Sequence, residues 1–242
     1  MNLKRTFQQK LDDLASVKDF GAVGNGTTDD TAAVNRAIQN LVTSDLTADA
    51  RRTVYFPAGT YKINASLTIP PFAHLVGEGP DKTIIKNSAS APALVTEDDE
   101  GQVHGNIGDS SATTPTQIQI SNMTIRTTVA YGGLSIDSAT KIFVNNVKFQ
   151  GTYVSGGSDA STSKGVTVRS TTALPCANIV FDQCQFTGFA RLVDLSFDVT
   201  NVRFTNCDFS TAYYGALLGA SMDGSTDGLT KGPRDVHFTG SS

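Results

Sequence analysis

One short pattern of apolar and polar positions recurs five times in the C-terminal half of the chain. Each copy has apolar side chains at positions 1, 3, 6 and 8, and the four complete copies have an amide residue at position 5. The copies occupy residues 118–125, 142–149, 179–186, 202–209 and, cut short, 236–240. Their third positions are separated by 24, 37, 23 and 34 residues. Repeats of this length are typical of folds in which structural units stack on one another.

Within each copy the pattern predicts a strand, a corner and a second strand. The apolar-x-apolar alternation is a strand signal, and asparagine suits a tight bend because it tolerates left-handed backbone angles. Further short strands are expected between the copies, at residues 133–137, 165–169, 191–197 and 214–218. Three short strands in a turn of about 23 residues predict an all-β chain, a single-stranded right-handed parallel β-helix.

Stacked coils should place equivalent residues in columns. Two interior columns are expected, one of Ile120, Val144, Phe181, Phe204 and Phe238 and one of Ile125, Phe149, Phe186 and Phe209. An amide ladder should run through Asn122, Asn146, Gln183 and Asn206. Cys184 and Cys207 take the same position in consecutive copies, so they should be buried neighbours, either as two thiols or as a disulfide.

The N-terminal third predicts two helices. The first, over residues 4–14, has a stripe of Leu3, Phe7, Leu11 and Leu14 that suits either a threefold contact between chains or packing on its own domain. The second follows Asp30 and has Ala33, Val34, Ala37, Ile38 and Leu41 on one side. It should cap the first coil, whose core and strand edges would otherwise be open. Thr28 or Asp29 is the expected N-cap, with Asp30 at the positive end of the helix.

Composition narrows the class of protein. Hydrophobic residues make up 39% of the chain and charged residues 17%, which is typical of β-rich proteins with many turns. The net charge is −4 and the basic residues are scattered, which argues against a nucleic-acid surface. No apolar run is long enough for membrane insertion, and no secretory signal is present. Gly21, Gly24 and Gly26 stand in the wrong order for a dinucleotide site, so we expect no cofactor.

Three stretches carry a family resemblance. Residues 16–31 (SVKDFGAVGNGTTDDT), 54–63 (VYFPAGTYKI) and 74–86 (HLVGEGPDKTIIK) resemble the opening of the pectate-lyase-like superfamily, in the branch of phage tailspikes and polygalacturonase-like proteins. The resemblance implies a homotrimeric tailspike or tail-fibre protein of the virion. Its partners would be a bacterial capsule or lipopolysaccharide glycan and, through residues 1–16, a phage tail or baseplate protein. The alternatives are a free extracellular polysaccharide hydrolase or lyase and a purely structural virion protein.

Superfamily enzymes cleave glycans with paired carboxylates or with calcium and a basic residue, but neither set can be recognised here. The three histidines, His74, His104 and His237, form no catalytic group, and no metal site is expected. Enzyme activity therefore stays open.

The remaining candidates are outward positions of the coils. If Val193, Leu195 and Phe197 point inward, then Asp194, Ser196 and Asp198 should point to solvent. Asp137 and Arg169 lie outward on the two preceding coils by the same alternation. We predict Asp194, Asp198 and Asp137 as catalytic candidates, since carboxylates on neighbouring rungs could suit glycoside hydrolysis. Arg169 and Ser196 would belong to a glycan groove. The alternative is an ordinary solvated exterior.

The expected organisation is a connector at 1–16, a cap with the first coils at 17–87, a Gly/Ser/Thr-rich insertion at 88–117, and further coils at 118–242. The last copy stops inside the pattern, so we expect a longer parent protein or a second chain over that end.

Overall fold

The computed structural model describes residues 14–42, 53–96, 115–170, 176–196, 198–219 and 232–242. Its elements in chain order are β1 (Leu14–Ser16), the 3-10 helix η1 (Val17–Phe20), β2 (Asn25–Asp29), α2 (Thr31–Val42), β3 (Thr53–Phe56), β4 (Gly59–Ile63), β5 (Leu67–Ile69), β6 (His74–Gly77), β7 (Thr83–Asn87), β8 (Leu94–Thr96), β9 (Gln119–Thr127), β10 (Leu134–Asp137), β11 (Thr140–Gln150), β12 (Lys164–Arg169), β13 (Cys176–Asp182), β14 (Gln185–Ser196), β15 (Val199–Thr205), β16 (Asp208–Gly219) and β17 (Arg234–Thr239).

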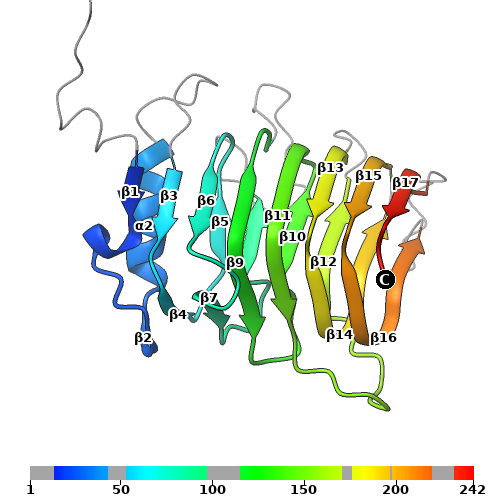
Figure 1. Cartoon of the computed structure of the whole chain (residues 1–242), viewed down its shortest axis with the longest axis horizontal. Helices are drawn as coiled ribbons and strands as arrows, with labels where there is room; N and C mark the ends of the chain where they lie inside the picture. The colour runs from blue at the N-terminus through cyan, green and yellow to red at the C-terminus, as the bar shows by residue number, and fades with distance from the viewer. Residues whose placement is uncertain (1–13, 43–52, 97–114, 171–175, 197, 220–231) are drawn as a thin grey trace, which may run out of the picture.

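The strands coil around a single core, and the pairings between them are parallel (Figure 1). They form three faces. The first face contains β1, β3, β6, the start of β9, the start of β11, β13, β15 and β17. The second contains β2, β4, β7, the ends of β9 and β11, and the starts of β14 and β16. The third contains β5, β8, β10, β12 and the ends of β14 and β16. The predicted parallel β-helix is confirmed.

Aromatic rings fill the interior of the C-terminal coils in the two predicted columns. Phe186 stacks between Phe149 and Phe209, with ring centroids 5.0 Å away on each side. Phe204 stacks in the same way between Phe181 at 4.9 Å and Phe238 at 4.8 Å. The two columns meet edge to face, so each ring is packed along the axis and across the core.

The amide residues form the corner between the first and second faces. Asn122, Asn146, Gln183 and Asn206 have φ values of 57°, 51°, 54° and 52°, the left-handed region that the sequence pattern predicts for them. Asn146 Nδ2 donates to Asn122 Oδ1 at 2.8 Å, a ladder bond along the stack. In the fifth copy Gly240 takes this place with a φ of 59°.

Cys184 and Cys207 are buried free thiols next to each other, each directly after a corner amide. The hydrogen bond with Cys207 and burial both raise the pKa of Cys184. Such a thiol is a poor nucleophile at neutral pH. Both side chains are buried in the core, where they pack as small hydrophobic groups.

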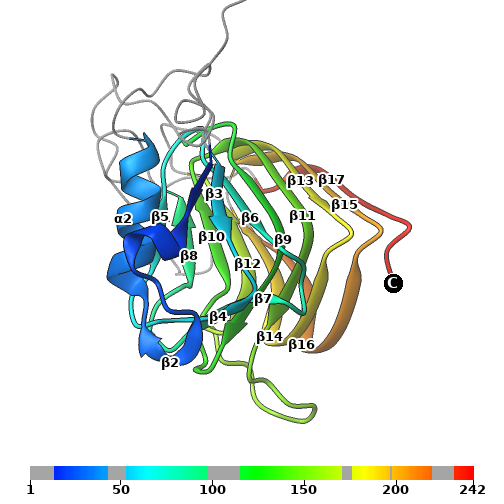
Figure 2. The same cartoon turned by 60° about the vertical axis from the view of Figure 1, so that its left-hand side comes forward.

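Helix α2 lies at the N-terminal end of the coils, next to β1 (Figure 2). Ala33, Val34, Ala37 and Ile38 are buried and continuous with the core. Asp30 was expected to act on the positive N-terminal end of α2, but its side chain binds the preceding turn. Its buried carboxylate accepts hydrogen bonds from Val23 N at 2.7 Å and Gly24 N at 3.0 Å, so it ties down the preceding glycine-rich turn.

Two boundaries differ from the predicted organisation. Leu14–Ser16 is strand β1 paired with β3, so these residues already belong to the first coil. The segment expected as an insertion contains strand β8, which pairs with β5 and β10. The short apolar run Ala93–Val95 was missed because it directly follows Pro92 and a serine-rich stretch. The predicted helix before Leu14 lies outside the described residues. No helix within the described ranges is long and apolar enough to cross a membrane.

Candidate functional site

The third face brings four of the five predicted site residues together. Asp137, Arg169 and Ser196 follow one another in register on β10, β12 and β14. Ser135, Thr167 and Asp194 form the neighbouring column. Val193 and Leu195 are fully buried in the core, as the sequence predicts.

The predicted site residues on this face were expected to be exposed to solvent, but most of them are buried. Asp137, Asp194 and Ser196 are only 4%, 1% and 5% exposed, so they are not solvated side chains. Asp198 follows β14 at a corner, where it pairs with Arg234 of β17 instead of extending the column.

Ion pairs explain how carboxylates are buried here. Asp194 Oδ2 lies 2.8 Å from Lys164 Nζ and 3.5 Å from Arg191 Nη1. Arg191 also binds Asp159, with Nη2–Oδ2 at 2.6 Å and Nε–Oδ1 at 3.1 Å. Hydrogen bonding to Arg191 lowers the pKa of Asp159, and the same bond raises the pKa of Arg191. A bidentate pair of this kind fixes both side chains.

Asp137 is held in the same manner. It pairs with Arg169, and its Oδ2 accepts a hydrogen bond from Ser135 Oγ at 2.8 Å. Burying a carboxylate is costly unless it is paired, so these contacts stabilise the face. The catalytic role of Asp194, Asp198 and Asp137 stays a prediction, as does the groove role of Arg169 and Ser196. Among the described residues no three His, Cys, Asp or Glu side chains are grouped so as to hold a metal ion.

A groove of about 610 Å³ lies along the edge of the second face, where its strands end. Half of its lining residues are threonines, joined by one amide, one cation and one aromatic ring; the lining includes Arg126, Thr128, Gln150, Tyr153, Thr187 and Thr211. A volume of this size suits a ligand of several rings.

Two glycines line the groove and let successive coils pack closely there. A Cβ on Gly151 would lie 2.1 Å from the carbonyl oxygen of Gly188, so successive coils touch through their backbones there. Gly188 has a φ of 72°, which favours glycine. Glycine at both positions therefore lets the backbones of successive coils approach each other at the groove.

Tyr153 is held in place by its own loop, which connects β11 to β12. Its backbone N donates to Gly188 O at 2.6 Å, and its hydroxyl donates to Gly157 O at 3.2 Å. The same loop contains Asp159, the partner of Arg191 on the third face. The ion pairs of the third face therefore also anchor the loop that forms one wall of the groove.

Sequence reasoning missed this groove, although a signal was present. The position directly after each complete copy of the repeat is Arg126, Gln150, Thr187 and Ser210. These residues are polar and in register on β9, β11, β14 and β16. A pattern extended by one position would have predicted an outward polar column.

Comparisons with known proteins agree with this architecture. The model of the family described as rhamnogalacturonase A/epimerase, pectate lyase-like, matches residues 14–227. A probable glucan endo-1,3-beta-glucosidase of Arthroderma benhamiae is 28% identical over 207 residues, which are 80% of this chain and 22% of that protein. The chain thus spans about a fifth of that relative's length.

Solved structures share the fold at low sequence identity. The Dettilon tailspike protein gp208 superposes with a TM-score of 0.68 at 12% identity, covering 98% of this chain and 40% of that one. The tailspike gp49 of the Acinetobacter baumannii bacteriophage Fri1, a capsular polysaccharide depolymerase, gives 0.65 at 14% identity, covering 95% and 42%. These similarities show the fold, and the family match covers most of the chain. The chain belongs to the rhamnogalacturonase A/epimerase, pectate lyase-like family.

Proposed function

We propose that this chain is the glycan-binding β-helix of a phage tail protein and that it attaches to a polysaccharide of the bacterial surface. The observation that carries the proposal is the groove beside Tyr153, with its hydroxyl, amide and guanidinium lining. Sugars present hydroxyls on their edges and C–H groups on their faces. The groove offers hydrogen-bonding partners for the first and an amphipathic aromatic ring for the second.

The virion location is supported by resemblance in fold. The two solved structures named above are tailspikes, and one of them depolymerises a capsular polysaccharide. The glucanase relative supports the wider statement that the chain acts on polysaccharides, and also the alternative of a free polysaccharide hydrolase.

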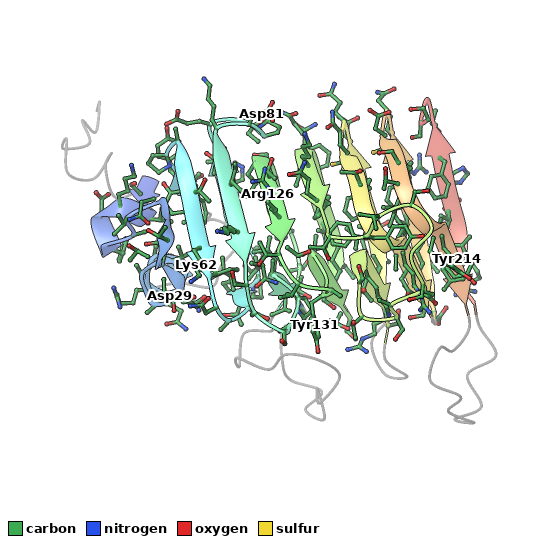
Figure 3. All side chains as sticks on the ribbon, turned by 90° about the horizontal axis from the view of Figure 1, so that it is seen from below. Asp29, Lys62, Asp81, Arg126, Tyr131 and Tyr214 are labelled. Atoms are coloured by element: carbon green, nitrogen blue, oxygen red, sulfur yellow. The ribbon has the colours of Figure 1, made fainter. Side chains whose placement is uncertain are left out.

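Binding is expected to depend on Tyr153. The purified chain should bind at least one member of a panel of capsular polysaccharides and O-antigens in biolayer interferometry. Tyr153→Ala should weaken that binding at least tenfold, about 1.4 kcal/mol, because it removes the rigid ring from the groove wall. The matched control is Tyr214→Ala, an exposed aromatic at the far end of the coils (Figure 3). The proposal fails if no polysaccharide binds or if both variants lose affinity equally. New reducing ends in the same samples would add cleavage to binding.

The homotrimer is a separate part of the proposal and follows from the tailspike resemblance. Light scattering should give three times the chain mass of 25.5 kDa. A monomer at micromolar concentration would contradict the trimer and would favour the free-enzyme alternative.

A further inference from the structure

We propose that the ion pair between Asp159 and Arg191 positions Tyr153 for sugar binding, although neither partner lines the groove. The pair acts through the loop of residues 151–163, which connects β11 to β12 and projects beyond the coils (Figure 1). The inference rests on the proposed glycan binding and adds a positioning residue to it.

The coils hold both ends of this loop. Near its start, Tyr153 N donates to Gly188 O at 2.6 Å. At its end, Arg191 N donates to Ser163 O at 3.0 Å. Between the two ends the tip of the loop reaches into solvent, and Val154 is 70% exposed there. The position of the tip therefore depends on the contacts that the loop makes within itself and through Asp159.

The ring of Tyr153 packs against the tip. Its hydroxyl donates to Gly157 O at 3.2 Å, and Gly157 N donates to Val154 O at 3.0 Å, so residues 153–157 form a closed turn. A Cβ on Gly157 would lie 3.1 Å from Cε2 of Tyr153, so the ring lies directly on this glycine. A displacement of the turn would therefore move the ring as well.

Asp159 fixes the loop two residues after Gly157. Its carboxylate accepts two hydrogen bonds from Arg191, which fix geometry as well as adding energy. The Arg191 side chain is 9% exposed and the Asp159 side chain 25% exposed. Water therefore screens this pair less than it screens a fully exposed ion pair, which contributes little.

Arg191 is a firm anchor because it belongs to the coils. It lies on β14, in register with Lys164 of β12 and Tyr214 of β16. Asp194 also binds its guanidinium, with Nη1–Oδ2 at 3.5 Å. A loop attached to such a point is ordered before a ligand arrives. Binding then does not have to order the loop, and this preorganisation raises affinity.

Biolayer interferometry with the polysaccharide of the panel that binds most tightly tests the inference. Asp159→Ala should weaken binding about tenfold, and Asp159→Glu should recover most of the affinity because it keeps the charge. In the Tyr153→Ala background, Asp159→Ala should add almost nothing, since a residue that acts through the ring has no effect once the ring is absent. The matched control is Asp81→Ala, which should leave affinity unchanged, because the ion pair of Asp81 with Lys148 involves no residue of this loop.

A tryptophan reporter follows residue 153 without any ligand. The chain contains no tryptophan, so Tyr153→Trp introduces a single fluorophore. Asp159→Ala in that protein should raise acrylamide quenching of its emission severalfold, and Asp81→Ala should not. If Asp159→Ala fails to fold, Asp159→Asn tests the same pair, because it keeps the size of the side chain and removes the charge.

Unchanged affinity together with unchanged quenching would overturn the inference, because the loop would then be held without the pair. An equal loss of affinity with and without the Tyr153 ring would also overturn it, since the effect would not pass through Tyr153. Increased quenching at unchanged affinity would show that binding does not depend on the position of the ring. If no polysaccharide binds at all, the proposed function fails, and the quenching alone decides whether the pair positions residue 153.

Discussion

Replacement of Phe186 by alanine should lower the free energy of unfolding by about 3–5 kcal/mol. The ring is fully buried and stacked on both sides, against Phe149 and Phe209, and it also meets Phe181 and Phe204 edge to face. Its removal leaves a cavity in the middle of the aromatic columns. The coils around it are fixed by parallel hydrogen-bonded ladders, so they cannot collapse into the space.

Urea unfolding at equilibrium measures this loss as a shift of the midpoint at constant slope. Phe143→Ala is the control, because Phe143 projects outward from the first face and is 40% exposed. It should change stability by no more than about 0.5 kcal/mol. If Phe186→Ala fails to fold, Phe186→Leu should still fold with a loss of about 1.5 kcal/mol. Similar losses for Phe186→Ala and Phe143→Ala would contradict the stacked core.

The second large effect is expected from Asp194→Ala, a loss of about 3 kcal/mol. Asp194 is the common partner of Lys164 and Arg191 on the third face. Without it Lys164 keeps a positive charge with no carboxylate in its former place, and removal of one partner of a buried pair costs far more than the pair itself contributes. The expected loss of stability is at the low end of the range for breaking a buried ion pair. The reasons are that the Lys164 side chain is partly exposed and that Arg191 still pairs with Asp159.

Urea unfolding also tests this variant, with Asp208→Ala as its control. Asp208 is an exposed carboxylate at the start of β16, so its removal should fall within about 0.5 kcal/mol. An Asp194→Ala protein as stable as the parent would mean that the buried charges of the third face contribute nothing to the fold.

The interior of this protein could be predicted from sequence because stacking repeats the same requirement on every coil. Asn146 takes a left-handed corner and Phe186 stacks between two rings, and the same residue types recur at the same positions of the neighbouring coils. Strand β8 was missed for the opposite reason. It is a single short run, and its repeat partners Leu67 and Leu134 lie in segments with a different local pattern.

For the exterior, the sequence predicts which side of a strand a residue lies on, but not whether its side chain is exposed. Alternation along β14 predicted buried Val193 and Leu195 but an exposed Asp194, which is 1% exposed, because burial depends on partners from distant parts of the chain. Asp159 reaches Arg191 from a loop 32 residues away, and no local pattern predicts that contact. The groove also depends on a contact that no local pattern predicts. Arg126 belongs to a regular column, whereas Tyr153 reaches the column through the same irregular loop.

A crystal structure of the chain with an oligosaccharide from the polysaccharide that it binds tests the central claim most directly. We predict sugar density in the groove, with one ring against Tyr153 and sugar hydroxyls within hydrogen-bonding distance of Arg126 and Gln150. Sugar bound only on the third face beside Arg169, or no sugar on the coils at a concentration that saturates binding in solution, would contradict this account.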